Sequence, residues 1–158
     1  MKLAEIVAPG AIVASLKSTD RDGVIGELVD ALVACGAAEK SQRGDLIAKV
    51  VERERRGSTG FGRGVAVPHV KHKGVKKMSA SLGVSPRGVD FASLDKQPVY
   101  SVFLLLSPED KPEEHLQAME VIFRSLSKDA FRRSLRQAGS ATDISTLLSE
   151  ADHQQITG

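Results

Sequence analysis

Apolar and polar positions along the chain predict strands and helices that follow one another in turn. Short runs rich in β-branched residues predict strands over residues 11–16 and 65–67, and a looser alternation predicts another over 79–84. The unbroken apolar run 99–106 predicts a strand that is covered on both faces. Apolar residues at helical spacing, with capping residues and breakers at the ends, predict helices over about 20–35, 41–55, 112–127, 129–138 and 142–149.

This order of elements indicates an α/β fold in which helices cover a sheet. We expect one domain over residues 1–158, with a packed core over about 3–149 and a short polar tail over 150–158. Cys35 closes the apolar face of the first long helix, so we expect it to pack in the core. It is the only cysteine of the chain, which excludes an intrachain disulfide and fits a reducing compartment.

Composition and charge exclude several classes of function. Lys and Arg number 22 and Asp and Glu number 20, so the net charge of +2 gives no argument for nucleic-acid binding. Aromatic residues make up only 4% of the chain, which leaves few rings for stacking on bases. No segment has the pattern of a targeting signal or the length of a membrane span. We expect a soluble, cytoplasmic protein without nucleic acid as a partner and without direct membrane insertion.

Two of the four histidines stand where the predicted elements favour a ligand site. His69 follows the strand 65–67 and Pro68 directly, beside a glycine-rich loop, so a buried strand delivers its ring to a strand end. His115 lies in the first turn of the helix 112–127, where free backbone N–H groups and the helix dipole favour an anion. Each has a plain structural alternative: His69 caps a strand, and His115 is a buried histidine bonded to a backbone carbonyl.

Familiar catalytic motifs are absent from the sequence, which has neither a G-x-S-x-G elbow nor a glycine loop that ends in G-K-[ST]. Arg53 and Arg55 lie near the end of the helix 41–55, and one arginine turned toward the adjacent glycine loop can pair with a phosphoryl group. The other interpretation is a solvated charged face. The lysines that follow His69 form either a solvated hairpin or a positive surface for a phosphorylated partner. They are Lys71, Lys73, Lys76 and Lys77.

A metal site is the competing use of the same histidines. His69 and His72 have an H-x-x-H spacing, and His115 can supply a third ligand. The signal is weak, because no carboxylate or cysteine accompanies the histidines at a useful spacing and a nearby arginine opposes a cation. Elemental analysis of the purified protein would identify a histidine metal-binding protein.

Three segments of the sequence carry a family pattern. Residues 52–69 read ERERRGSTGFGRGVAVPH, residues 88–116 read GVDFASLDKQPVYSVFLLLSPEDKPEEHL, and residues 13–20 read VASLKSTD. In this order they resemble the type 2 EIIA domain of the phosphoenolpyruvate-dependent sugar phosphotransferase system (PTS). This is the fructose/mannitol type, which includes the nitrogen-regulatory IIA proteins. The resemblance covers about residues 3–149, nearly the whole chain.

The resemblance implies a mixed β-sheet with helices on both faces, in a single three-layer domain. It also implies a phosphocarrier, which accepts a phosphoryl group from the phosphohistidine of HPr or its paralogue NPr. The group then passes to a downstream IIB domain or serves as a signal to a regulated target protein. No cofactor and no metal is implied, because the donor is already a high-energy phosphoramidate. The lack of a fused membrane or sugar-specific domain favours nitrogen regulation over a sugar-specific IIA subunit of a fructose/mannitol-type transporter.

Residue by residue, the resemblance places the phosphorylated histidine at His69, the second active-site histidine at His115 and the active-site arginine at Arg53. It implies that Nε2 of His69 attacks phosphorus, and we expect the other ring nitrogen to donate to a backbone carbonyl. His115 would donate to the phosphoryl oxygens, while Arg53 and backbone N–H groups of the glycine loop offset their charge. The loop positions beside the site are Ser58, Thr59 and Gly60.

One departure from the family pattern follows the Pro-His pair. The family usually has a small residue and then a basic one there, whereas this sequence reads V-K-H-K over residues 70–73. Val70 narrows the approach to His69, and His72 adds a second base. The departure therefore bears on the choice of partner more than on the chemistry.

Overall fold

Five strands form one mixed β-sheet in the computed structural model, which describes residues 1–60 and 62–157. In chain order they are β1 (Val7–Val13), β2 (Val65–Ala66), β3 (His69–His72), β4 (Ser79–Val89) and β5 (Val99–Pro108). β4 and β5 pair antiparallel in the centre, and β1 lies parallel beside β4. Both β2 and β3 lie parallel to β5 on its other side, so they form one edge of the sheet.

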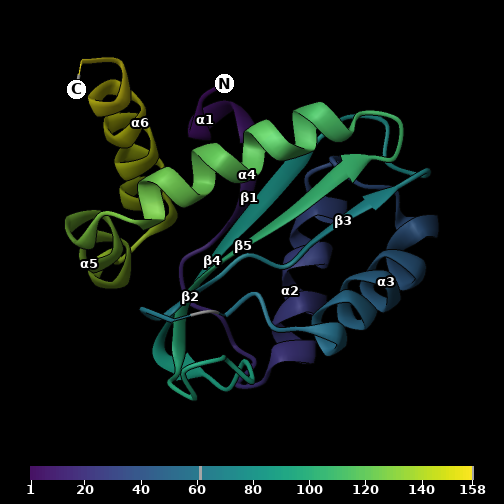
Figure 1. The fold of residues 1–158 in the computed structure, drawn as a ribbon, viewed down its shortest axis with the longest axis horizontal. Helices are drawn as coiled ribbons and strands as arrows, with labels where there is room; N and C mark the ends of the chain where they lie inside the picture. The colour runs from purple at the N-terminus through teal and green to yellow at the C-terminus, as the bar shows by residue number, and fades with distance from the viewer. Residues whose placement is uncertain (61, 158) are drawn as a thin grey trace.

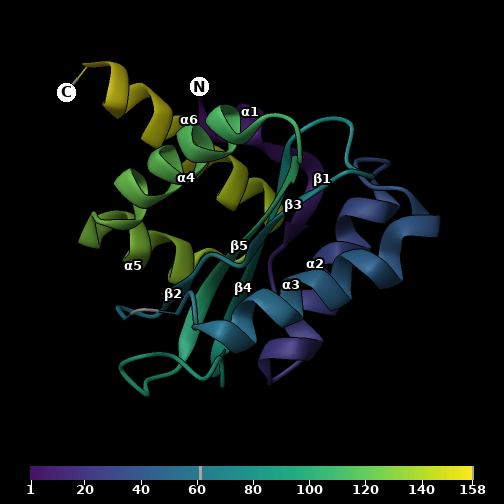
Figure 2. The ribbon, with the colours of Figure 1, turned by 45° about the vertical axis from the view of Figure 1, so that its right-hand side comes forward.

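Helices pack against both faces of this sheet, so the molecule has three layers (Figure 1, Figure 2). This confirms the predicted mixed sheet with helices on both faces. One outer layer comes from the first half of the chain, and the other combines the N-terminal turn with the last three helices. The first holds α2 (Arg21–Ala34), the 3₁₀ turn η1 (Lys40–Gln42) and α3 (Arg43–Arg56), and the second holds α1 (Leu3–Ile6), α4 (Pro112–Leu126), α5 (Asp129–Gln137) and α6 (Ala141–Thr157).

The apolar run that predicts a doubly covered strand forms β5. Side chains alternate between the two faces of a strand, so Phe103 and Leu105 pack in the core on the α4 side. Val102 and Leu104 pack in the core under α2 and α3. All four are fully buried, and each such side chain stabilises the fold by about 1.5–3 kcal/mol. The same alternation tells on which face of the sheet each later residue of β5 lies, and this places the residues that pair with the candidate site.

β1 and β4 differ most from the predicted strands, and β3 is not predicted by the sequence pattern. β1 occupies Val7–Val13 instead of 11–16, and β4 continues to Val89, beyond the predicted end. The sequence pattern predicts no strand at β3, because three of its four residues are histidine or lysine. β3 lies at the sheet edge and has one exposed residue, Lys71, so its polar side chains are tolerated. His69 therefore opens a strand and does not follow the end of one.

The predicted core position of Cys35 is wrong. α2 ends at the residue before it, and Gly36 then adopts a left-handed conformation with a φ of 82°. The two residues after Gly36 donate their backbone N–H groups to the carbonyl of Leu32, which closes the helix end. The buried stripe of α2 stops at Leu32, and Cys35 is exposed.

The predicted polar tail over 150–158 is helical as far as Thr157, because α6 continues through it. Asp152 is 6% exposed, and its carboxylate accepts hydrogen bonds from the backbone N–H groups of Leu3 (2.6 Å) and Ala4 (3.0 Å). These donors belong to the first turn of α1, which has no partners for them within the helix. α6 is the longest helix of the described residues, and no helix there is long and apolar enough to cross a membrane.

Candidate active site

His69 and His115 meet between β3 and α4. His69 is the first residue of β3 and lies opposite Leu105 of β5, whose side chain packs on the α4 side of the sheet. Paired residues of parallel strands project to the same face, so the His69 ring also points to that side. His115 stands in the first turn of α4. The two ring centroids lie 5.3 Å apart, and the ring planes are inclined at 52°.

The half-buried ring of His69 is held in one tautomer. Its Nδ1 lies 2.8 Å from the carbonyl oxygen of Val67, and since a carbonyl only accepts, Nδ1 carries the proton and donates. This confirms the expected bond to a backbone carbonyl and leaves a lone pair on Nε2. Burial lowers the pKa of His69 below 6.5, the Val67 carbonyl opposes that shift, and the charge of Arg53 adds to it. The ring is therefore neutral at pH 7.

His115 is neutral as well, but a different kind of group holds it. The residue is only 8% exposed, and its Nδ1 lies 2.7 Å from the hydroxyl oxygen of Ser107 on β5. The partner is thus a side chain, not the backbone carbonyl of the structural alternative. Burial lowers the pKa of His115 to about 4, with smaller contributions from His69 and Lys71.

His72 lies on the opposite face of the sheet. Because it comes three residues after His69 in the same strand, its ring points toward α3. Its Nε2 bonds to the carboxylate of Asp45, and its Nδ1 accepts from the backbone N–H of Gly74 at 2.8 Å. The hydrogen bond from His72 lowers the pKa of Asp45. The H-x-x-H spacing therefore separates the two rings, and residues 1–60 and 62–157 contain no group of three metal-ligating side chains.

Arg53 lies at the end of α3, beside the glycine loop. Its Nη1 donates to the carbonyl oxygen of Gly57 at 2.9 Å, which fixes the guanidinium over the start of the loop. The charge of Arg53 contributes to the lowered pKa of His69, so its field reaches that ring. Arg55, two residues later, is far more exposed and has its ion pair with Asp22 at 3.9 Å. Of these two arginines, Arg53 is the one whose charge acts on the candidate site.

The predicted phosphate loop over 58–60 bonds to itself and to α3. The hydroxyl oxygen of Ser58 accepts from the backbone N–H of Gly60 at 2.9 Å. The backbone N–H and the hydroxyl of buried Thr59 both donate to the carboxylate of Glu54. In the described part of the chain, no hydrogen bond joins these groups to the histidine rings. The loop is thus built into the end of α3.

The sequence patterns gave no role to two residues that the structure brings into the site's support. Ser107 lies two residues after Leu105, on the same face of β5 as His69, so a period-of-two reading of that strand could have found it. Glu54 lies in a run of charged residues, and this pattern predicts a solvent-exposed side chain. It is 2% exposed, and only its tertiary bonds to Thr59 reveal its place.

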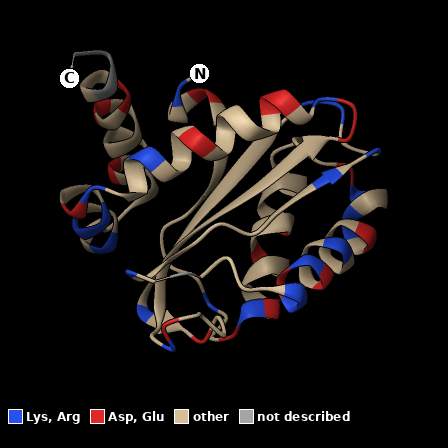
Figure 3. Ribbon diagram, in the orientation of Figure 1, with Lys and Arg blue, Asp and Glu red and all other residues tan. Residues whose placement is uncertain are grey.

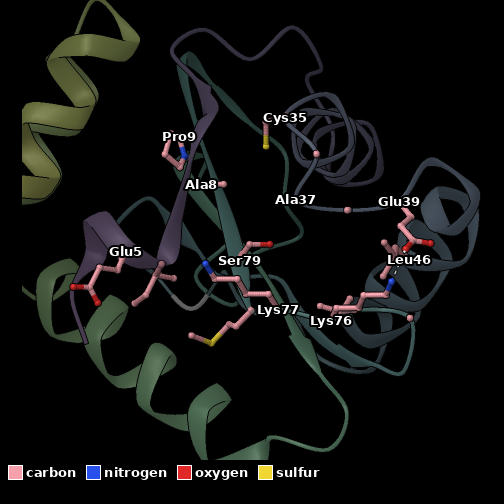
Figure 4. A pocket seen from close by; sticks show the side chains of 16 residues that line it. Glu5, Ala8, Pro9, Cys35, Ala37, Glu39, Leu46, Lys76, Lys77 and Ser79 are labelled. Carbon is pink, nitrogen blue, oxygen red and sulfur yellow. Dashed lines mark ion pairs between the residues drawn. The ribbon is translucent and has the colours of Figure 1, made fainter.

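The two histidines line an open hollow of about 670 Å³, together with Leu116 and Met119 of α4. A more enclosed cavity of about 390 Å³ lies elsewhere, between α1, β1, the end of α2 and the β3–β4 loop (Figure 4). Its wall includes an ion pair between Lys76 and Glu39 at 3.6 Å. None of the candidate site residues lines this cavity, and the two histidine rings line the open hollow instead.

Basic residues surround the site unevenly. Figure 3 shows basic colouring on β3, which contains one lysine, and along α3, where acidic residues lie among the basic ones. Lys71 of β3 is exposed, and its charge contributes to the lowered pKa of both His69 and His115. Lys76, by contrast, is paired with Glu39 and lies at the other cavity. Of the predicted lysine cluster, Lys71 is thus the member that acts on the two rings.

Comparison with known proteins identifies the family. Residues 5–151 match the family described as "Phosphoenolpyruvate-dependent sugar phosphotransferase system, EIIA 2". A nitrogen regulatory protein of Bradyrhizobium diazoefficiens is 35% identical over 150 residues, which are 94% of this chain and 95% of that protein. The fructose-specific EIIABC component of the PTS of Bacillus subtilis is 31% identical over 152 residues, which are 96% of this chain but only 24% of that protein.

Solved structures share the fold. Nitrogen regulatory protein IIA-Ntr from Neisseria meningitidis matches with a TM-score of 0.82 and 30% identity, over 92% of this chain and 98% of that one. The complex of enzyme IIAMTL and phosphorylated enzyme IIBMTL from Escherichia coli matches with a TM-score of 0.76 over 91% of this chain and 97% of that one; its 20% identity supports the fold alone. The chain therefore belongs to the type 2 EIIA family of the phosphoenolpyruvate-dependent sugar phosphotransferase system, as its sequence motifs predict.

Proposed function

We propose that the protein is a cytoplasmic phosphocarrier that accepts a phosphoryl group on Nε2 of His69 from an HPr- or NPr-type donor. One observation carries this proposal: two neutral imidazoles lie 5.3 Å apart, and the bond from Nδ1 of His69 to a carbonyl leaves its Nε2 lone pair free. A neutral ring nitrogen with a free lone pair is the nucleophile that attack on phosphorus requires.

The transfer needs no proton movement at His69. The lone pair of its Nε2 forms the new N–P bond while the N–P bond of the donor breaks, and the electron pair of the broken bond returns to the donor's ring nitrogen. Nδ1 keeps its proton throughout, because it stays bonded to the carbonyl of Val67. The phosphorylated ring carries positive charge while that proton remains, and the charge strengthens the same hydrogen bond.

Groups around His69 balance the charge of the phosphoryl oxygens. His115 offers a ring N–H, Arg53 offers guanidinium donors, and Lys71 adds a positive field. Such catalysis consists mainly of positioning and electrostatic stabilisation. The loop over 58–60 contributes indirectly. Its internal bonds hold the turn that contains Gly57, and the carbonyl of Gly57 accepts a hydrogen bond from Arg53.

A protein donor suits the open hollow better than a small ligand does. Both rings line the hollow, and Leu116, which lines it with them, is 61% exposed. Met119 and Phe123 line the same hollow, and an apolar patch on the surface is a typical contact for a protein partner. The lining of the more enclosed cavity contains no histidine.

We favour a nitrogen-regulatory role, because relatives named for that role match this chain over nearly their full length in sequence and in structure. Transport is the second candidate, since the fructose-specific relative is almost as similar. The two roles differ in the acceptor. A regulatory protein keeps its phosphoryl group when it is offered a fructose- or mannitol-type IIB domain, whereas a transport subunit passes the group on.

The direct test is phosphoryl transfer from a radiolabelled phospho-HPr or phospho-NPr donor. We expect an acid-labile label on the wild-type protein and none on His69→Ala. His72→Ala is a matched control, because it removes a histidine from the same strand but from the other face. Full labelling of His69→Ala would overturn the proposal, as would loss of the label in a folded His72→Ala alone.

A further inference from the structure

We propose that Ser107 is a positioning residue for the transfer. Its hydroxyl donates to Nδ1 of His115 and so keeps the proton of that ring on Nε2, the nitrogen that is left to donate to a phosphoryl oxygen. The inference rests on the proposed function, because it concerns how His115 serves the phosphoryl group on His69. It states that the buried side chain of Ser107 determines which ring nitrogen of His115 carries the proton.

The geometry leaves room for a single hydrogen between the two groups. Ser107 is fully buried on β5, and its Oγ lies 2.7 Å from Nδ1 of His115. At that distance the hydrogen belongs either to the oxygen or to the nitrogen. The choice fixes the tautomer of the neutral ring, since the proton that is not on Nδ1 must be on Nε2.

Hydrogen-bond satisfaction decides between the two arrangements. If the ring donates, the hydroxyl hydrogen of Ser107 needs another acceptor, and the described residues supply none. Full burial also keeps water away from it, so this arrangement leaves a polar hydrogen unpaired in the core. If the hydroxyl donates, its hydrogen and the Nδ1 lone pair of His115 satisfy each other. The second arrangement is therefore the stable one.

The neutrality of His115 makes this choice matter. Burial lowers the pKa of the ring to about 4, so at pH 7 it carries one proton and not two. A cationic ring would donate from both nitrogens whatever its partner did. A neutral ring donates from only one, and Ser107 selects which.

The two rings of the site then have opposite tautomers. The carbonyl of Val67 holds the proton of His69 on Nδ1 and leaves the lone pair on Nε2. The hydroxyl of Ser107 does the reverse for His115. One ring thus supplies the nucleophile and its neighbour, 5.3 Å away, supplies the donor. With its proton on Nδ1, His115 would present a lone pair to the phosphoryl oxygens and repel them.

The first test reads the tautomers of the unmodified protein. Long-range ¹H–¹⁵N correlation of the ¹⁵N-histidine-labelled wild type at pH 7 shows which ring nitrogen carries the proton. We expect Nε2–H at His115 and Nδ1–H at His69. A proton on Nδ1 of His115 would overturn the proposal. This measurement needs no donor, no transfer and no variant, so it holds even if Ser107→Ala does not fold.

The second test compares three serine variants of β5. In Ser107→Ala we expect a shift of His115 toward Nδ1–H, a transfer rate about tenfold lower and an unchanged donor concentration for half-maximal rate. Ser107→Thr keeps a hydroxyl and should recover the wild-type tautomer and most of the rate. Ser101→Ala is the matched control, because Ser101 is another buried serine of β5 and has no bond to His115.

The outcomes separate this inference from the proposed function. A slower Ser107→Ala with the His115 tautomer unchanged would reduce Ser107 to a packing residue and contradict the inference. An unchanged rate despite a changed tautomer would contradict it too. If the wild type accepts no label at all, the phosphocarrier proposal fails, whereas the NMR experiment still reports independently whether Ser107 orients the ring.

Discussion

The histidine pair and the loop over 58–60 are both predicted to meet a phosphoryl group, but the fold bonds their polar groups in different ways. Each histidine of the pair uses one ring nitrogen for a hydrogen bond within the protein, and both rings line the open hollow. In the loop over 58–60, the donors of Thr59 bond to Glu54, the backbone N–H of Gly60 bonds to Ser58, and the hydroxyl of Ser58 bonds to the carbonyl of Phe91. The first set is kept available for a ligand, and the second set holds a turn in shape.

From this difference we infer that closeness to a site does not by itself make a residue part of the chemistry. A polar group serves a ligand only when the fold leaves one of its donors or lone pairs unused, because buried polar groups otherwise satisfy each other. Arg53 stands between the two sets: one guanidinium N–H is bonded to the loop, while its charge acts on His69. Four predictions test this division of roles, in order of decreasing effect on transfer.

Removing the second histidine should slow transfer most among these changes. His115→Ala takes away the N–H that we assign to the phosphoryl oxygens, and loss of one such donor costs about 10²-fold in rate. The label should still be found on His69. Gln117→Ala, an exposed position on the same helix, is the control and should transfer at the wild-type rate. Equal rates for His115→Ala and this control would make His115 a structural residue.

Removing the arginine should have a smaller effect. Arg53→Ala should lower the transfer rate about tenfold, because a half-exposed charge is partly screened by solvent. Arg55→Ala removes the same charge from the same helix, but from a side chain that is 68% exposed and paired with Asp22. Its rate should stay close to that of the wild type. Equal losses in the two variants would mean that only net charge matters.

Acidification tests the neutrality of the histidine pair. The folded-state pKa values of both rings lie below 6.5, so the rate at pH 6.5 should stay above half of its value at pH 7.5 and fall below pH 6.5. The unfolded chain binds a proton at His115 near pH 6.5, whereas the folded chain does so only near pH 4. The free energy of unfolding should therefore decrease as the pH falls through this window.

Two comparisons isolate the contribution of His115 from that of other titrating groups. Urea midpoints between pH 7 and pH 4.5 should fall less steeply for His115→Ala than for the wild type. Transfer rates over the same range should be measured with the donor in excess. A rate that rises below pH 6.5, or equal slopes for the two proteins, would contradict neutral rings in the folded state.

Changing the loop should affect stability and hardly affect transfer. Thr59→Val removes the hydroxyl that donates to buried Glu54, which should lower the free energy of unfolding by about 1–3 kcal/mol. The transfer rate should remain within about twofold of the wild type, because the Thr59 hydroxyl is already occupied. Ser58→Ala removes a 3.4 Å bond to the carbonyl of Phe91 and a 2.9 Å bond from the backbone N–H of Gly60; both are only partly buried, so this variant should lose less stability. A rate loss without a stability loss would place the loop in the chemistry.

The sequence predicts well the features that depend on pattern alone. The alternation of elements predicts the layered α/β fold, and the apolar run over 99–106 predicts the doubly buried strand β5. The motif around Pro68 and His69, together with the first turn of α4, predicts two histidines for one site, and they lie 5.3 Å apart. Motif order and strand position were sufficient there, because each ring is delivered by a regular element.

The remaining features depend on contacts between distant parts of the chain. His72 and His69 lie on opposite faces because β3 is a strand. The sequence pattern does not predict this strand, because an edge strand tolerates polar residues. Asp152 reads as part of a polar tail, yet it is buried because α1 has free N–H groups at that place. Ser107 and Glu54 have partners only eight and five residues away, and their roles depend on the turn or loop that brings each pair together.

The most direct measurement of the central claim identifies the nitrogen that carries the phosphoryl group. ³¹P and ¹⁵N NMR of the ¹⁵N-histidine-labelled protein, after incubation with a phosphorylated HPr- or NPr-type donor, should show phosphorus bonded to Nε2 of His69, with Nδ1 of that ring still bonded toward Val67. Phosphorus on His115, on His72 or on Nδ1 of His69 would contradict the account.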